Sequence, residues 1–310
     1  MTDPKFDISF HREYLHPRYI PSWLGIGILG ILAFIPAIVR DFVADILSGP
    51  VSKLNISFKK RVFNNFTYAF PDYDEMQKEK LYRDFVRIGL KVILGYGEMF
   101  FRSRSHIRKT YMITGKEYLD EALAQNRPVV FLGSHSWAVD RGGIMLAALG
   151  LTVCSLMHTS KNKVYDWFMN RMRLKFGGKI YERSAGIKAV IRALREGFHV
   201  SFYPDEDLGP KSAVFVKFFA SPKASLVVVP KLAEHGNALV VPMFSAYNEE
   251  HHKFEIIFDR YFDNYPSKDI KADVRRMNEA IENALKGREG QYMWFLKYYV
   301  TRPEAEEDPN

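Results

Sequence analysis

The chain has 310 residues, of which 47% are hydrophobic and 26% charged, and it contains no low-complexity stretch. This composition excludes a largely disordered or fibrous protein and suffices for one large or two ordinary globular domains. The formal net charge of +8 favours an acidic partner, which can be nucleic acid, an anionic membrane surface, a phosphorylated substrate or an acidic carrier protein. A single cysteine, Cys154, excludes an intrachain disulfide, and its apolar neighbours predict a small core residue rather than a catalytic thiol.

The N-terminal segment, residues 1–50, contains the uncharged stretch IPSWLGIGILGILAFIPAIV at residues 20–39. About twenty apolar residues in a helix span the hydrocarbon core of a bilayer, so the stretch predicts a membrane-anchoring helix. Trp23 falls where an interfacial aromatic residue is expected, and Pro36 would kink or end the helix. A buried core helix is the alternative. Basic residues flank the stretch on both sides, so the positive-inside rule does not orient it.

Residues 51–305 are expected to form one domain, followed by a disordered acidic tail at 306–310. Apolar β-rich runs alternate with helical patterns, which predicts an α/β fold in which a mixed sheet is covered by helices. The expected strands are at residues 127–133, 151–157, 199–205, 238–244 and 254–260, and the expected helices lie around 75–101, 138–149, 163–176, 185–196, 223–235 and 268–286. The aromatic and basic residues of 87–109 suit either a helix in the headgroup layer or an ordinary amphipathic helix.

The run VVFLGSHSWAVD at residues 129–140 ends with a histidine and an aspartate, His135 and Asp140. On one continuous helix these two side chains would lie ~140° apart. We therefore expect His135 in a loop at a strand end and Asp140 in the first turn of a helix, with the loop folded back so that the carboxylate orients the imidazole. Such a ring can take a proton from a hydroxyl nucleophile. The plain alternative is that Asp140 caps the helix and that His135 is a loop residue with its hydrogen bonds made locally.

Two further stretches combine charged residues with turn residues. In ERSAGIKAVIRALREG, Arg183, Gly186 and Lys188 stand at a helix start, where an arginine fork and free backbone N–H groups can bind phosphate. A surface arginine before a routine helix explains the same residues. In YPDEDLGPK, Asp205 and Asp207 precede Gly209. These acids can bind sugar hydroxyls or amides or position arginines, or they can form a solvated loop. A metal site is not expected, because no histidine cluster accompanies them.

Pro242, in VVPMF, ends a strand that by itself reads as ordinary buried core. The C-terminal QYMWFLKYYVTRP interleaves aromatic and basic residues, which suits nucleic-acid or lipid-headgroup contact. With HSWAVD as an H-x-x-x-x-D motif, these blocks resemble the late acyltransferases of lipid A biosynthesis, within the lysophospholipid acyltransferase superfamily. The resemblance runs from His16 almost to the C-terminal end of this sequence. The motif sequence HSWAVD is most similar to that of family members that add the last secondary acyl chain, commonly myristoyl.

The resemblance implies a glycerol-3-phosphate-acyltransferase-like fold for residues 51–305. It also implies transfer of a C12–C14 acyl chain from acyl carrier protein to a hydroxyl of a 3-hydroxyacyl chain on a Kdo-linked lipid A precursor. His135 would be the base, Asp140 would hold its ring, and Arg183, Gly186, Lys188, Asp205, Asp207, Gly209 and Pro242 would bind substrate. No cofactor, metal or nucleic acid is implied. The expected location is the bacterial inner membrane, contacting its lipids, with the catalytic domain facing the cytoplasm. Transfer to a lysophospholipid or another glycolipid, and hydrolysis of the acyl thioester, are the alternatives.

Overall fold

The computed structural model describes residues 8–54 and 57–303; the acidic tail at 306–310 lies outside them. The helices are α1 (Ile20–Leu32), α2 (Ala37–Lys53), α3 (Ser57–Ala69), α4 (Glu75–Leu94), α5 (Gly97–Phe101), α6 (Arg104–Thr110), α7 (Lys116–Ala124), α8 (Val139–Ala148), α9 (Lys163–Arg173), α10 (Gly186–Arg195), α11 (Val228–Gly236) and α12 (Ile270–Leu285). The strands are β1 (Tyr111–Thr114), β2 (Val129–Leu132), β3 (Val153–Met157), β4 (Lys179–Glu182), β5 (His199–Phe202), β6 (Ala213–Phe218), β7 (Ser221–Leu226), β8 (Leu239–Asn248) and β9 (Lys253–Phe258).

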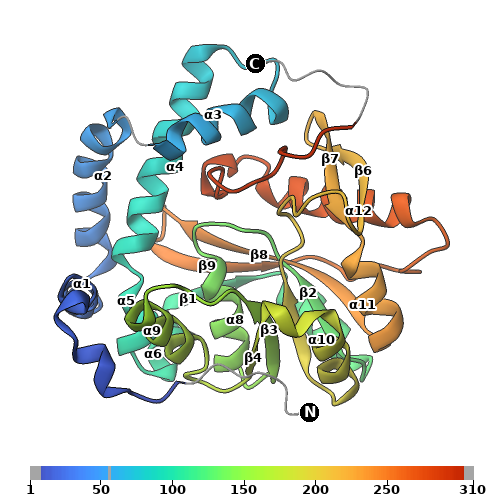
Figure 1. Cartoon of the computed structure of the whole chain (residues 1–310), viewed down its shortest axis with the longest axis horizontal. Coiled ribbons are helices and arrows are strands. Elements are labelled where there is room, and N and C mark those ends of the chain that lie inside the picture. The colour runs from blue at the N-terminus through green and yellow to red at the C-terminus, as the bar shows by residue number, and fades with distance from the viewer. Residues whose placement is uncertain (1–7, 55–56, 304–310) are drawn as a thin grey trace.

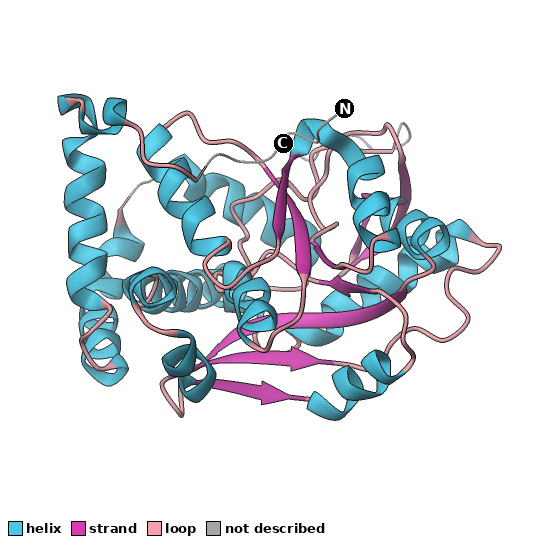
Figure 2. Cartoon of the chain, turned by 90° about the horizontal axis from the view of Figure 1, so that it is seen from below, coloured by secondary structure: helices cyan, strands magenta, loops and turns pink. Residues whose placement is uncertain are grey.

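Seven of the described strands form one sheet in the order β1-β9-β8-β2-β5-β3-β4 (Figure 1). Strands β8 and β9 are antiparallel, and every other neighbouring pair is parallel. The predicted mixed sheet is therefore confirmed. Strands β6 and β7 form a separate antiparallel ribbon. Figure 2 shows the strands from a second direction, with the helices packed around them.

Helices cover the sheet on both faces because successive strand residues point to opposite sides. On β2, Val129 and Phe131 pack with residues of α4, α7 and α8, whereas Val130 and Leu132 pack with residues of α10, α11 and α12. All four side chains are buried. Double coverage explains why the sequence shows continuous apolar runs at the central strands rather than alternation. Cys154 is buried in the second of these clusters, and burial raises the pKa of its thiol to about 12, as expected for a core residue.

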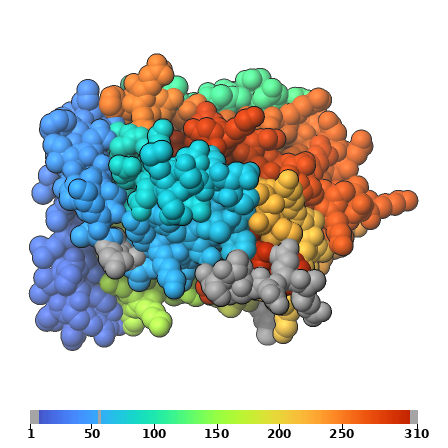
Figure 3. All heavy atoms as spheres, turned by 90° about the horizontal axis from the view of Figure 1, so that it is seen from above, coloured from blue at the N-terminus to red at the C-terminus, as the bar shows by residue number. Residues whose placement is uncertain are grey.

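The predicted membrane helix at residues 20–39 is wrong as a single element. The structure divides it into α1 and α2, which are joined by a turn at residues 33–36. Pro36 stands at the N-cap of α2; because proline has no backbone N–H, it cannot continue the hydrogen bonds of α1. Over the described residues, no helix combines the length and the apolarity needed to cross a bilayer. The two helices lie at one end of the molecule, where α2 packs against α4 and α1 packs against α5 (Figures 1 and 3).

Other expected elements match the structure except at two places. The expected helix at 75–101 is broken between α4 and α5, at Gly95 and Tyr96. The expected helix at 223–235 is wrong in its first part, because residues 221–226 form β7 and the helix begins only at α11. Strands β1, β4, β6 and β7 were not predicted; β1 and β4 are four-residue edge strands, too short for a clear pattern.

The contact between α1 and α5 depends on a glycine, and its replacement is our first testable prediction. A Cβ atom placed on Gly97 would lie 2.0 Å from the backbone oxygen of Leu29. We expect Gly97→Ala to separate the helices and lower the unfolding free energy by about 1–3 kcal/mol, as overpacking does elsewhere. Thermal unfolding in neutral detergent measures the change. Gly49→Ala, in α2, is the matched control because a Cβ there meets nothing within 4 Å. An unchanged midpoint for Gly97→Ala would contradict the close packing.

Candidate active site

The candidate site lies where two neighbouring strands of the sheet end. Strands β2 and β5 are parallel, and Leu132 stands opposite Phe202 in the register. His135 and Asp205 each follow three residues after these positions, so both leave the sheet at its carboxyl edge. Ligand sites of α/β proteins favour this edge. His135 was expected at a strand end, and the structure places it there.

The imidazole of His135 is paired with the carboxylate of Asp205. Its Nδ1 lies 2.6 Å from Oδ1 of Asp205, and the His135 backbone N–H donates to Oδ2 at 2.7 Å. The hydroxyl of Tyr292 also donates to Oδ2, at 2.8 Å. Asp205 is fully buried, while 24% of the His135 side chain is exposed. With Nδ1 held by the carboxylate, the ring carries its proton there and offers the lone pair of Nε2.

The charges around this pair set its protonation. Burial alone lowers the pKa of His135, but Asp205, with smaller contributions from Glu206 and Asp140, outweighs burial and raises it above the ordinary value. Burial raises the pKa of the Asp205 carboxyl, yet His135 and Lys223 hold it below its usual range. Lys223 itself is buried, which lowers its pKa to about 8 despite nearby carboxylates, and its ammonium donates to the Asp205 backbone oxygen at 2.7 Å.

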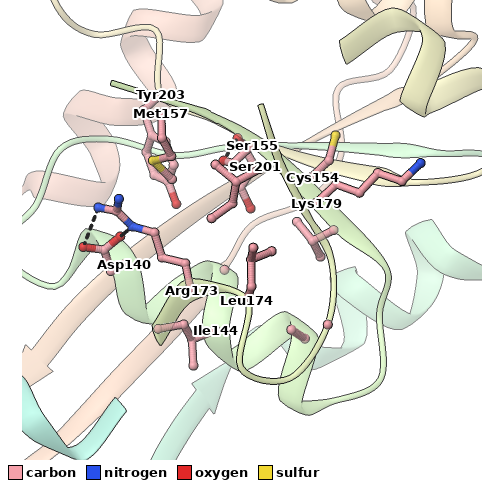
Figure 4. A pocket seen from close by; sticks show the side chains of 15 residues that line it. Asp140, Ile144, Cys154, Ser155, Met157, Arg173, Leu174, Lys179, Ser201 and Tyr203 are labelled. Atoms are coloured by element: carbon pink, nitrogen blue, oxygen red, sulfur yellow. Dashed lines mark hydrogen bonds and ion pairs between the residues drawn. The ribbon is translucent and has the colours of Figure 1, made fainter. Parts of the chain in front are cut away.

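Asp140 does not hold the histidine ring, which corrects the expectation from the sequence. It lies in the first turn of α8, as predicted, but its carboxylate accepts from Nε of Arg173 at 2.6 Å and from Nη2 at 3.3 Å (Figure 4). The hydroxyl of Tyr96 donates to the same carboxylate. Burial raises the pKa of Asp140, but Arg173 and Tyr96 bring it below the ordinary value. The carboxylate that orients His135 comes instead from the neighbouring strand end.

A cavity of about 240 Å³ joins these groups. His135, Asp140, Arg173 and Arg183 line it together. Arg183 is exposed at its rim, directly after β4, whereas the Arg173 side chain is mostly covered. A second, smaller cavity of about 40 Å³ adjoins it, shares Asp140 and Arg173 with it, and has a mainly apolar wall from α8, β3 and β4 (Figure 4). Arg173 was missed in the sequence because it reads there as one of several basic residues ending an amphipathic helix.

The other residues singled out in the sequence lie outside this cavity. Gly186 begins α10 with a φ of 65°, and Lys188 is exposed on that helix. Asp207 accepts from the backbone N–H groups of Gly209 and Thr301, at 2.9 and 2.6 Å. Pro242 is paired with Leu132 inside the sheet. In the structure, Asp207 and Gly209 therefore hold a loop against the C-terminal segment, and none of these residues lines the His135 cavity.

The C-terminal aromatic block is a support for the histidine loop. Met293 donates its backbone N–H to the His135 carbonyl at 2.8 Å, and Trp137 donates to the Gln291 carbonyl at 2.9 Å. Tyr292 and Trp294 are fully buried. The expectation that the aromatic side chains of this block contact an external ligand is therefore wrong for these two residues, because they fill the core beside the site.

This arrangement can perform base catalysis on a hydroxyl that enters from outside. Ser136 offers no nucleophile, because its buried hydroxyl donates to the Ser245 carbonyl at 2.6 Å. In the part of the chain that the structure describes, no group of three or more histidine, cysteine or acidic side chains is arranged to hold a metal ion. Nε2 of His135 is the ring nitrogen that Asp205 leaves available, and Arg173 and Arg183 line the same cavity as this ring.

Comparison with known proteins gives a consistent result. A family model described as bacterial lipid A biosynthesis acyltransferase matches residues 8–301. The chain is 33% identical to a lipid A biosynthesis acyltransferase of Haemophilus influenzae, over 97% of this chain and 94% of the relative. It is 32% identical to the lipid A biosynthesis myristoyltransferase of Escherichia coli, over 99% and 94% of the two chains. Among solved structures, the 1-acyl-sn-glycerophosphate acyltransferase of Thermotoga maritima aligns with 81% of this chain and 97% of its own, at 12% identity and a TM-score of 0.37.

Proposed function

The chain belongs to the bacterial lipid A biosynthesis acyltransferase family, and from this we propose that it transfers a C12–C14 acyl chain from acyl carrier protein to a Kdo-linked lipid A precursor. The acceptor group is the hydroxyl of a 3-hydroxyacyl chain. The observation that carries the proposal is the His135–Asp205 pair at the wall of a cavity that also contains Arg173 and Arg183. A general base that a buried carboxylate orients at a cavity wall suits direct transfer of an acyl group to the hydroxyl of a second substrate.

In the proposed reaction, Nε2 of His135 takes the proton of the acceptor hydroxyl while that oxygen attacks the thioester carbonyl carbon. The new C–O bond gives a tetrahedral intermediate with a negatively charged oxygen. When the intermediate collapses, the C–S bond breaks, and the leaving thiolate receives the proton from His135. Asp205 keeps Nδ1–H oriented and stabilises the transient imidazolium. A thioester is already activated, so the step as written uses no cofactor.

The two arginines have different proposed tasks. Arg173 uses Nε and Nη2 for Asp140, which leaves its Nη1 hydrogens available to the developing oxyanion. Arg183, exposed at the rim, suits a phosphate of the acceptor lipid. The formal net charge of +8 favours approach of the acidic carrier protein and of the phosphorylated acceptor alike. The smaller apolar cavity beside Arg173 is where we place part of the donor chain, since each buried methylene contributes ~0.8 kcal/mol.

We propose that the enzyme works at the inner-membrane surface, held there by α1 and α2, with its catalytic residues on the cytoplasmic side. Both helices expose large apolar side chains at helical spacing: Ile20, Leu24, Ile28, Ile31, Ile38, Val39, Phe42, Val43, Ile46 and Leu47. A helix with such a face lies in the interfacial region of a bilayer with its apolar side chains buried. Lipid contact along these faces takes the place of the single membrane crossing expected from the sequence.

Charges placed on these faces are predicted to release the protein from membranes. Ile28 and Ile46 are 58% and 59% exposed, so neither is needed to fill the protein core. The double variant Ile28→Glu/Ile46→Glu lacks two apolar side chains that the bilayer would bury on binding, each contributing about 1.5–3 kcal/mol, and its partition into vesicles should fall by more than about 100-fold. Vesicle flotation measures it. Met76→Glu is the control, since Met76 is 74% exposed on α4, outside these faces. Unchanged flotation of the double variant would disprove the role of α1 and α2.

Mass spectrometry tests the reaction. Purified full-length protein is given acyl carrier protein loaded with C12, C14 or C16 chains and a tetra- or penta-acylated lipid A precursor. We expect a mass gain of one acyl chain on the lipid, with the C12 and C14 donors preferred, and a gain at least about 100-fold slower with His135→Ala. Free fatty acid as the sole product would identify a thioesterase. Acylation of lysophospholipid but not of the lipid A precursor would assign another acceptor.

A further inference from the structure

A second polar cavity, of about 310 Å³, lies away from His135 and shares no lining residue with the His135 cavity. One wall is the turn between α1 and α2, residues 33–37, and the others come from α5, α6 and the residues around the start of β9. Its walls are rich in basic and imidazole side chains: Arg40, Arg102, His106, His251, His252 and Lys253. None of these has a part in the proposed acyl transfer.

Positive charge exceeds negative charge at this cavity. Of its lining residues only Glu98 is acidic, and the Glu98 carboxylate is already engaged by Arg40 at 2.5 Å and by Arg141 at 3.3 Å. For Arg102 and Lys253, no ion pair with a carboxylate is present within residues 8–54 and 57–303. A cavity with two such cations favours an anionic ligand.

His106 supplies a donor without an acceptor. Its Nδ1 lies 2.8 Å from Nη2 of Arg102, and since the guanidinium can only donate, Nδ1 accepts. Burial and the positive charge of Arg102 both lower the pKa of His106, so the ring is neutral and carries its proton on Nε2. That nitrogen is buried and has no hydrogen-bond partner among the described residues. A buried unsatisfied donor is costly, which calls for an acceptor in the cavity.

The apolar wall indicates where the anion comes from. The guanidinium of Arg102 lies over the ring of Phe34, 4.8 Å from its centroid. Phe34 is 64% exposed and lies in the turn between α1 and α2. Ile31 on α1 and Ile38 on α2, on either side of it in the sequence, are 68% and 60% exposed. A basic cavity that opens beside an exposed apolar edge matches a phosphate that carries acyl chains.

We propose that this cavity binds the phosphate of an anionic membrane glycerophospholipid, with Nε2–H of His106 and the Arg102 guanidinium donating to phosphate oxygens. Lys253 attracts the headgroup from the cavity's edge, and the lipid chains lie along Phe34 and Ile38. The site is a lipid-binding site separate from the acyl-transfer site, and it does not depend on which acyl transfer the enzyme performs.

Titration of the full-length protein in neutral detergent with dihexanoylphosphatidylglycerol tests the site, using isothermal calorimetry. His106→Phe keeps a planar ring but removes the Nε2–H donor, and Arg102→Met removes the guanidinium group. Each is expected to weaken binding at least about tenfold, the effect of losing one hydrogen bond to a charged group. Arg108→Met is the matched control, because Arg108 is an exposed cation of the same helix as His106 that does not line the cavity. Its affinity should equal that of the unmodified protein.

Three results would overturn the proposal. Equal binding of dihexanoylphosphatidylcholine would show that the negative charge is not recognised. Inorganic phosphate binding as tightly as the lipid, and displacing it, would assign the cavity to a free anion. Unchanged affinity in folded His106→Phe would place the lipid elsewhere. If that variant loses cooperative thermal unfolding, Lys253→Met decides the question: Lys253 is exposed, and its variant should bind the lipid more weakly, whereas unchanged binding refutes the site.

Discussion

Replacement of His135 by alanine is expected to lower kcat for acyl transfer by about 10²–10⁴-fold, the usual contribution of a positioned general base. The thermal midpoint should stay close to that of the unmodified protein. The His135 side chain is 24% exposed at the cavity wall, and its loop is also held through backbone atoms that the substitution keeps. Single-turnover kinetics with acyl carrier protein as donor measure the chemical step, and thermal unfolding is measured on the same sample.

A matched control for this variant is His158→Ala. His158 also lines the cavity, but no hydrogen bond or ion pair holds it within the described part of the chain. Its removal should leave kcat nearly unchanged and alter at most the KM for the lipid. Full activity of His135→Ala, or an equal loss in both variants, would refute the assignment of the base.

Asp205→Asn is expected to reduce kcat by about 10²–10⁴-fold and to change its pH dependence. The neutral imidazole is the active form, so activity falls as the pH drops through the pKa of His135. Asp205 raises that pKa against the effect of burial. With the carboxylate gone, burial dominates, and the acid limb of the kcat/KM profile should move to lower pH. A limb that stays in place would show that Asp205 does not set the protonation of the ring.

Asp140→Asn separates the roles of the two aspartates. Asp140 is the weakest of the contributions that raise the pKa of His135, so the acid limb should move little. The substitution leaves Arg173 mostly covered and without its carboxylate, and breaking a buried pair in this way typically costs about 3–5 kcal/mol of stability. We therefore expect a lower thermal midpoint with the pH profile in place. A shifted limb with normal stability would restore Asp140 as the partner of the histidine.

The sequence predicted the location of the histidine but not its partner, for a physical reason. The apolar run at 129–132 marks β2, and the polar residues after it mark the strand end, so His135 could be placed from local pattern alone. Its partner depends on which strand lies next to β2. That strand is β5, about seventy residues later in the chain (202 − 132 = 70). The local periodicity of a sequence predicts strands but not their order in the sheet. Asp205 was recognised as a site residue, but its contact with the ring required the parallel register.

The N-terminal segment shows the opposite case: its apolar composition was recognised, but one helix was predicted where the structure has two. Residues 20–39 contain no charge, and Pro36 was recognised as a possible end. Hydropathy alone cannot distinguish one long helix from two short ones, because both expose apolar side chains. The turn at residues 33–36 ends α1 before Pro36 at the N-cap of α2, and α1 then packs against α5 through Leu29 and Gly30. Such contacts between distant segments are not visible in a sequence pattern.

The support of the histidine loop by the C-terminal segment also bears on the order of events during synthesis. Ser136 forms a β-bridge with Tyr292, which the ribosome adds 156 residues later (292 − 136). Contacts of such separation form late in folding, because closing a long loop costs conformational entropy. Until Tyr292 has emerged, Asp205 lacks one of its donors and His135 lacks its backbone partner, Met293. A nascent chain stopped before Tyr292 can therefore present its N-terminal helices to the membrane while its base is not yet in place.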